Sequence, residues 1–170
     1  MVTTTHKKEL RDALTKSFDN FIQTFSLFEE DDVNQIPFPG SWTPCQVVVH
    51  IIMATDGVPD GNTSPAHRPY DANVAKIRPW WADLSKKFKS PEPLLPDDQP
   101  RSKTVLLEEL NRVRAKDLTI IDKADLSVVC LDFELPGVGY LTRFEWLWFS
   151  EMHLKRHQFQ IANMLKHVTQ

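Results

Sequence analysis

At 170 residues, the chain has the length of one ordinary domain, and its 41% hydrophobic and 25% charged residues are typical of soluble globular proteins. Its net charge of −3, without a long basic run, argues against a nucleic-acid partner. No stretch approaches the roughly 18 uncharged apolar residues of a membrane span, and the first residues lack the apolar run of a leader peptide. We therefore expect a single cytoplasmic domain over residues 1–170 that binds neither nucleic acid nor membrane.

The first half of the chain predicts two helices. Apolar residues recur at three- and four-residue spacing over residues 3–30, which indicates a long amphipathic helix with one face in the core. The second helix begins with several start signals: Thr43 as the N-cap, Pro44 in the first position and Gln46 closing a capping box. This second helix is apolar almost all round and is expected to end near Gly57. Its one titratable residue is His50.

Residues 56–100 form a long connection rich in Pro, Gly, Asn and Ser. A stretch of that length without structure is uncommon, so a short helix is expected within residues 71–89. The length also allows the connection to cross the bundle, which leaves the helices before and after it parallel. Trp80 and Trp81 are expected to cap the bundle core; alternatively, they line the mouth of the site described below.

The second half predicts two further helices. Residues 102–123 have helical apolar periodicity with Glu, Arg and Lys between. Residues 131–135 alternate apolar and acidic side chains, which predicts an extended segment with one side on the core. Pro136-Gly137 suits the centre of a type II turn. The last helix begins at Thr142, with Glu145 closing a second capping box, and continues to about residue 164.

The last helix carries metal-ligand spacing. His153 and His157 stand four residues apart, so both imidazoles lie on one face, and that face is otherwise largely apolar. His50 lies roughly 10 Å along its own helix, at a compatible height if the two helices are antiparallel. Three inward imidazoles repel one another when charged and lack acceptors when neutral, which a divalent metal ion resolves. The alternative is that each histidine is hydrogen-bonded to a carbonyl or hydroxyl group in a plain structural bundle.

Other polar residues have weaker assignments. Gln160 and Ser150 lie one turn from the ligands and either orient them or are ordinary buried polar residues. Arg156 is rotated by about 100° from His157 and is expected to face solvent or a subunit interface. We expect Cys45 to be a small buried hydrophobic residue and not a reactive thiol. A disulfide bridge between Cys45 and Cys130 is disfavoured. The remaining histidines, expected in solvent, are His6, His67 and His167.

Several of these motifs resemble those of one family. The sequence SWTP at residues 41–44 leading into His50, and GYLT at residues 139–142 leading into His153 and His157, resemble the DinB-like (DinB/YfiT) superfamily of metal-binding four-helix bundles. The sequence KSPEPLLP at residues 89–96 resembles one of its branches. The resemblance implies a single DinB-like domain with an all-α fold, a four-helix bundle running up-down-down-up, with a long crossover connection between helices 2 and 3. It also implies a homodimer and assigns the metal ligands to His50, His153 and His157.

A three-histidine site leaves a coordination position open, which is typical of catalytic rather than structural ions. An all-imidazole set suits Zn, Ni, Cu or Fe(II). The expected function is that of a metal-dependent enzyme that activates a thiol, or less favourably water, for attack on a small-molecule substrate. The resemblance adds S-transferases that use a low-molecular-weight thiol such as bacillithiol or mycothiol; with water the enzyme is a hydrolase. The alternative is a non-enzymatic metal- or small-ligand-binding bundle, stress-related or sensory, because the sequence identifies no general base and leaves catalysis open.

Overall fold

The computed structural model describes residues 1–168 of the chain. Within them lie five α-helices, one 3₁₀ helix and two short strands. In chain order these are α1 (Thr4–Ser26), α2 (Pro44–Thr55), β1 (Thr63–Ser64), α3 (Val74–Ala82), η1 (Glu92–Leu94), α4 (Lys103–Lys123), β2 (Val129–Cys130) and α5 (Arg143–Val168). The strands pair antiparallel, with Thr63 opposite Cys130.

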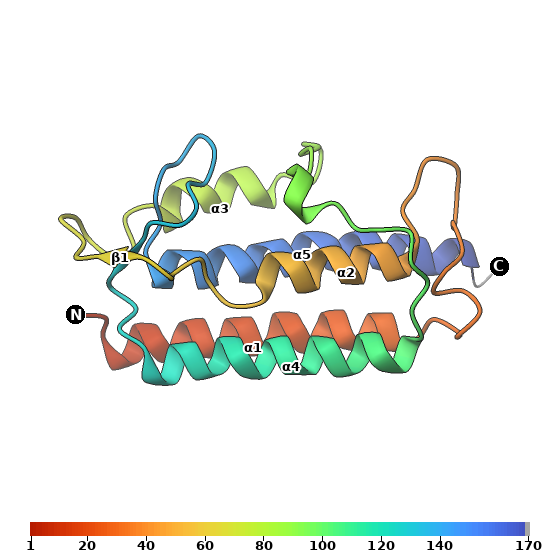
Figure 1. Ribbon diagram of the computed structural model, residues 1–170, viewed down its shortest axis with the longest axis horizontal. Coiled ribbons are helices and arrows are strands. Elements are labelled where there is room, and N and C mark those ends of the chain that lie inside the picture. The colour runs from red at the N-terminus through yellow and green to blue at the C-terminus, as the bar shows by residue number, and fades with distance from the viewer. Residues whose placement is uncertain (169–170) are drawn as a thin grey trace.

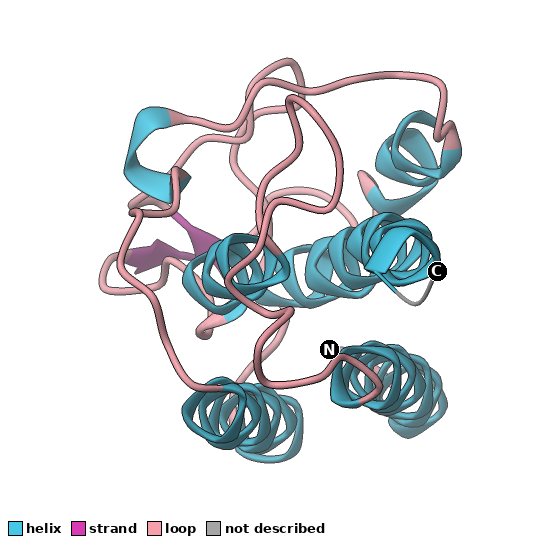
Figure 2. Ribbon diagram, turned by 90° about the vertical axis from the view of Figure 1, so that its right-hand side faces the viewer, coloured by secondary structure: helices cyan, strands magenta, loops and turns pink. Residues whose placement is uncertain are grey.

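Helices α1, α2, α4 and α5 form an up-down-down-up four-helix bundle, as the sequence predicts. Figure 1 shows α1 and α5 running in one direction and α2 and α4 in the other. α1 packs on α4 and α5, and α2 packs on the same two helices. The connection over residues 56–102 contains β1, α3 and η1, and Figure 2 shows these elements and the loops gathered on one side of the bundle. The long crossover is therefore what makes α2 and α4 parallel.

The helix starts are those that local sequence predicts. Thr43 Oγ1 accepts the Gln46 N–H at 3.1 Å, and Gln46 Oε1 accepts the Thr43 N–H at 2.9 Å. Thr142 and Glu145 exchange the same pair of hydrogen bonds before α5. Each box satisfies two backbone donors that the first helical turn leaves free. The two helices that carry the predicted site histidines, α2 and α5, thus begin at fixed residues, which sets the position of those histidines.

Helix α5 is covered on two faces rather than one. The main core lies between the four bundle helices and includes Phe18, Phe21, Phe25, Leu110, Leu154, Ile161 and Met164. A second cluster lies between α3 and α5 and includes Ile77, Leu135, Trp146, Phe149 and Met152. The single inward stripe predicted for α5 is therefore divided between two clusters. The reason is that α3 covers a face of α5 that the other bundle helices leave open.

The connections between the helices differ from the expectations in two places and agree with them in a third. The helix expected within residues 71–89 is confined to Val74–Ala82, and residues 83–91 have no regular helix or strand. Of the alternating segment only Leu135 is buried, while Leu131 and Phe133 are each 40% exposed, so its predicted core-facing side is largely wrong. The turn at Pro136-Gly137 is present: the Val138 N–H donates to the Leu135 carbonyl at 3.0 Å, and Gly137 has φ +78°.

Cys45 and Cys130 are both buried and free, so no bridge joins them. Over residues 1–168, no helix combines the length and apolar character that crossing a membrane requires.

Candidate metal centre

The structure brings the three predicted histidines together. His50 projects from α2, and His153 and His157 project from successive turns of the antiparallel α5. The Nε2 atoms of His50 and His153 lie 3.0 Å apart, and one potential ligand atom from each of the three residues lies within 4.8 Å of the others. His50 and His153 are only 4% and 5% exposed, respectively. Ligand nitrogens around a tetrahedral zinc ion lie about 3.4 Å apart, so the His50–His153 pair is already close to that spacing.

Two of the three rings are oriented by hydrogen bonds on their far nitrogen. His50 Nδ1 lies 2.8 Å from the Leu94 carbonyl oxygen, and His157 Nδ1 lies 2.6 Å from Gln160 Oε1. Both partners accept, so each Nδ1 carries the proton and each Nε2 presents a lone pair. Acceptors of this kind fix the ring and raise its basicity as a metal ligand. Gln160 therefore has the orienting role that the sequence left open, whereas Ser150 is simply a buried residue on the same helix.

His153 provides the test of whether these residues fit a metal. Its Nδ1 is buried without a hydrogen-bond partner, and its Nε2 faces the Nε2 of His50. Because the His50 Nε2 carries a lone pair, the 3.0 Å contact needs either a proton from His153 or a cation shared by both nitrogens. A divalent ion would accept lone pairs from all three rings. The donor set therefore fits a transition metal that favours imidazole.

Burial keeps all three histidines neutral, which is the form that binds metal. Burial lowers the pKa of His50, although the Leu94 carbonyl partly opposes this. Burial also holds the pKa of His153 well below its usual value, with further lowering by His157, His50 and Arg156. The pKa of His157 falls to about 3, again chiefly through burial, with His50 contributing. Within the part of the chain described, the cluster contains no Asp, Glu or Cys ligand, so these residues leave the charge of a divalent ion uncompensated.

The site lies outside the main core. Figure 1 shows α3 and η1 on the side of α2 and α5 that faces away from α1 and α4, and the histidines contact residues of this layer. The walls are aromatic: ring centroids lie 5.3 Å apart for Trp42 and His50, 5.2 Å for Trp81 and His153, and 5.5 Å for Phe149 and His153. Trp81 therefore lines the site, the alternative considered from the sequence. Trp80 packs instead on Phe88, with centroids 5.1 Å apart.

Arg156 lies elsewhere than the sequence predicts. It is partly buried, and its guanidinium group donates hydrogen bonds to the carbonyls of Trp81, Asp83 and Lys86. The expectation that it faces solvent or a subunit interface is wrong, because the chain beyond α3 folds back over that face of α5. The signal in the sequence was the presence of aromatic residues in the loop after α3, because an arginine side chain packs favourably on aromatic rings. Helical periodicity alone could not identify which loop would meet it.

The other histidines lie away from the cluster. His67 and His167 are exposed, as expected. His6 is partly buried and hydrogen-bonded to the Tyr70 hydroxyl, so its expected exposure is wrong.

Comparison with known proteins agrees with this architecture. A family model described as the DinB superfamily matches residues 13–161. The chain belongs to the DinB superfamily. This assignment rests on most of the chain and agrees with the resemblance seen in the motifs that precede His50 and His153.

Two solved structures of DinB-like proteins resemble the chain in fold. One is a candidate member of the DinB family from Exiguobacterium sibiricum 255-15, at 14% identity and TM-score 0.57, covering 99% of this chain and 95% of the other. The second is YfiT from Bacillus subtilis, at 13% identity and TM-score 0.61, covering 99% and 91%. YfiT is described as a probable metal-dependent hydrolase with an unusual four-helix bundle topology. No curated protein matches the chain significantly.

Proposed function

We propose that His50, His153 and His157 bind a divalent transition metal, such as Zn, Ni or Fe, and that the protein is a metal-dependent enzyme acting on a small molecule. The observation that carries the proposal is the set of three neutral imidazoles with no carboxylate or thiol among them. Structural zinc sites are normally closed by four protein ligands, whereas three ligands leave a position for a reactant. The chemistry that such an ion supplies is a lowered pKa for a thiol or water molecule that it binds.

The surrounding residues support this role. Leu94 and Gln160 orient the rings of His50 and His157 through their Nδ1 protons. Trp42, Trp81 and Phe149 restrict access of bulk water, which strengthens electrostatic interactions inside the site. An apolar wall beside an open coordination position suits a small molecule that has an apolar body and one group for the metal.

A low-molecular-weight thiol is the preferred nucleophile because the family resemblance includes thiol-dependent S-transferases. Hydrolysis is the second candidate, and the fold likeness to YfiT, which is described as a probable metal-dependent hydrolase, favours it. The non-enzymatic alternative is a bundle whose ion is structural or sensory. It predicts a large rise in melting temperature with metal and no turnover.

Metal binding is tested by calorimetric titration of Zn²⁺, Ni²⁺ and Fe²⁺ into metal-free protein. We expect about one ion per chain, and we expect binding to collapse in His153→Ala, because two histidines hold a divalent ion poorly. The matched control is His67→Ala, which removes an exposed histidine outside the cluster. Full affinity in His153→Ala would exclude the site.

Catalysis is tested separately by incubating metal-loaded protein with low-molecular-weight thiols and a chromogenic electrophile, and with chromogenic esters. Turnover that needs both thiol and metal supports the transferase, and ester turnover without thiol supports the hydrolase. Metal binding without either reaction supports the non-enzymatic alternative.

We also propose that residues 1–170 form a single domain and that the protein is a homodimer, as the family resemblance implies. Light scattering coupled to size-exclusion chromatography measures the oligomeric state.

A further inference from the structure

Residues 81–94, which we term the covering segment, lie over the histidine cluster. The segment begins at Trp81, whose ring lies 5.2 Å from that of His153. It ends at Leu94, whose carbonyl oxygen lies 2.8 Å from His50 Nδ1. One end of the segment thus touches a ligand of α5, and the other end touches a ligand of α2. The segment contributes directly to the near-complete burial of both rings.

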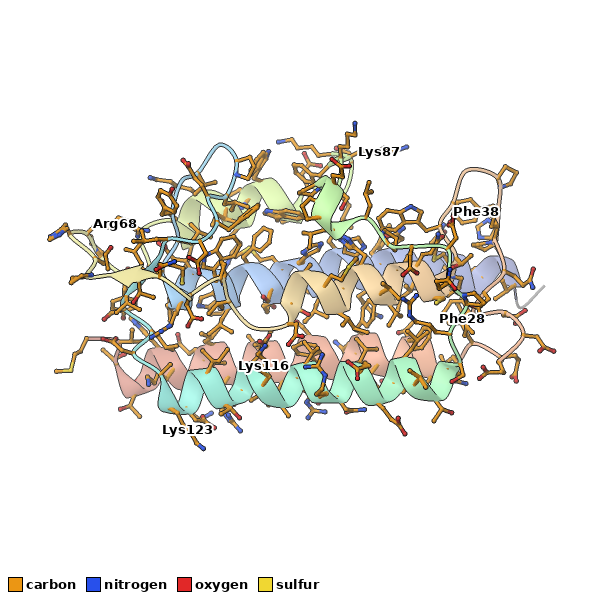
Figure 3. All side chains as sticks on the ribbon, in the orientation of Figure 1. Phe28, Phe38, Arg68, Lys87, Lys116 and Lys123 are labelled. Atoms are coloured by element: carbon orange, nitrogen blue, oxygen red, sulfur yellow. The ribbon has the colours of Figure 1, made fainter. Side chains whose placement is uncertain are left out.

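Apart from the Phe88 ring, which packs on Trp80 and Trp81 with centroids 5.1 and 4.7 Å away, little within the covering segment itself holds it in place. Residues 83–91 lack regular helix or strand, and most of their side chains are exposed, including Leu84 at 46%. Lys87 extends outward from the molecule beside η1 (Figure 3). The Asp83 carboxylate accepts hydrogen bonds only a short distance along the chain, from the backbone N–H and hydroxyl of Ser85. A segment with few buried apolar contacts opens at low free energy unless another element holds it.

Arg156 holds this segment by two kinds of interaction. Nη1 donates to the carbonyls of Trp81 at 3.3 Å and Asp83 at 3.1 Å, and Nη2 donates to the carbonyl of Lys86. The guanidinium also lies over the ring of Phe88, 4.7 Å from its centroid, and 5.6 Å from that of Trp81. A planar guanidinium can bind several carbonyls and stack on a ring at once, which a lysine ammonium cannot do.

The two attachments lie on the two helices that bear the histidines. Arg156 immediately precedes His157 on α5, and His50 is on α2. The covering segment therefore bridges α2 and α5 across the cluster. Release from Arg156 frees residues 83–88, while Trp81 stays packed on Phe149 with ring centroids 4.8 Å apart and Leu94 keeps its contact to His50. Displacement of this stretch removes Phe88 from the Trp81 ring, 4.7 Å away, and Trp81 is the ring that covers His153.

We propose that Arg156 is a positioning residue that keeps the covering segment closed over His50 and His153 and so controls the access of small molecules and metal ions to them. This inference rests on the proposed function for its biological meaning. The closing of the segment over the histidines, however, can be measured without any metal.

The first experiment measures access to the imidazoles in metal-free protein by timed diethylpyrocarbonate modification and mass spectrometry. In Arg156→Ala we expect His50 and His153 to react at least about tenfold faster than in the native protein, the change expected when hydrogen bonds to a charged donor are lost. Exposed His67 should react at the same rate in both. Hydrogen exchange of amides in residues 83–94 should accelerate by a similar factor. Arg156→Lys should behave like Arg156→Ala, because charge alone does not replace the guanidinium.

The matched control is Arg78→Ala. Arg78 also lies over a tryptophan ring, that of Trp148, with its guanidinium carbon 4.8 Å from the centroid. Its removal should leave histidine modification and segment exchange unchanged. If Arg156→Ala fails to fold, as judged by circular dichroism, Phe88→Ala removes the ring contact from the segment side and should raise the same two rates. Unchanged rates at His50 and His153 in a folded variant overturn the proposal.

A second experiment separates gating from ligand orientation in metal-loaded protein. Stopped-flow measurement with a chromophoric chelator should show that both the association and dissociation rates of Zn²⁺ rise in Arg156→Ala. A residue that only orients a ligand would raise the dissociation rate alone, and that result also overturns the proposal. If the native protein binds no metal, the proposed function fails, while the modification rates still decide the role of Arg156.

Discussion

Gln160 Oε1 lies 2.6 Å from His157 Nδ1, one turn along α5 and on the side of the ring away from the cluster. We expect Gln160→Ala to weaken metal binding by about 10- to 100-fold, the usual effect of removing the acceptor that orients a histidine ligand. Competition titration against a chelator of known affinity measures the change. Gln160→Glu, which keeps an acceptor at the same place, should retain most of the affinity.

Gln158 is the matched control for Gln160. It lies two residues earlier on α5, and its Nε2 donates instead to Thr24 Oγ1 of α1, at 2.7 Å. Gln158→Ala should leave metal affinity within about twofold of the native value because it contacts no ligand. Equal losses in the two variants would mean that the helix, not the Gln160–His157 hydrogen bond, is responsible.

Glu145 is a fully buried carboxylate with every oxygen bonded. Its oxygens accept from both terminal nitrogens of Arg68 at 2.7 Å, from the Asn73 N–H at 2.7 Å and from the Thr142 N–H at 2.8 Å. We expect Glu145→Ala to lower the free energy of unfolding by about 3 kcal/mol, because it leaves two backbone donors without an acceptor and the partly buried Arg68 guanidinium without its counterion. Urea denaturation followed by circular dichroism measures the loss.

Glu109 provides the comparison for Glu145. It pairs with Arg112 at 2.9 Å, but both side chains are more than 40% exposed, so Glu109→Ala should cost less than about 1 kcal/mol. If Glu145→Ala costs no more than Glu109→Ala, Glu145 does not anchor the loop before α3 to the start of α5.

The helices and the histidine cluster were accessible from sequence because their determinants are local. Capping boxes at Thr43 and Thr142 involve residues three apart, so they fix where α2 and α5 begin. Four-residue spacing fixes that His153 and His157 share a face. The long crossover makes α2 and α4 parallel, and α5 runs in the opposite direction, which brings His50 to the height of His153.

The covering segment could not be predicted because its determinants are distant. Residues 83–91 have no period of their own, and Arg156, more than 60 positions later, fixes their path through backbone carbonyls that carry no sequence signature. Helical periodicity also states which residues share a face without stating what covers that face. For this reason, the periodicity predicts that the face carrying His153 points into the bundle, whereas that face meets α3 and Trp81.

Asp117 of α4 predicts an unusual pH dependence of stability. It is fully buried; its Oδ1 accepts the Gly57 N–H at 3.1 Å, and its Oδ2 has no hydrogen-bond partner. Burial raises its pKa from 3.8 to about 8, while the Gly57 hydrogen bond opposes this and neighbouring Asp56 and Lys116 act in opposite directions. Between pH 4 and pH 8 the folded state therefore holds a proton that the unfolded state has lost, so this group lowers stability as pH rises.

Asp117→Asn removes that titration while keeping a neutral side chain of the same shape. We expect its free energy of unfolding to exceed that of the native protein by about 2 kcal/mol or more at pH 8, with the difference shrinking toward pH 4. Urea denaturation across this pH range measures it. Asp132 gives a control whose titration lies outside this range: hydrogen bonds from Asn62 lower its pKa below 3.8, so the stability difference between Asp132→Asn and the native protein should stay nearly constant from pH 4 to pH 8 and change only below about pH 4. A pH-independent difference for Asp117→Asn would mean that Asp117 is already ionised in the folded protein near pH 4, with its charge stabilised by the Gly57 N–H and Lys116.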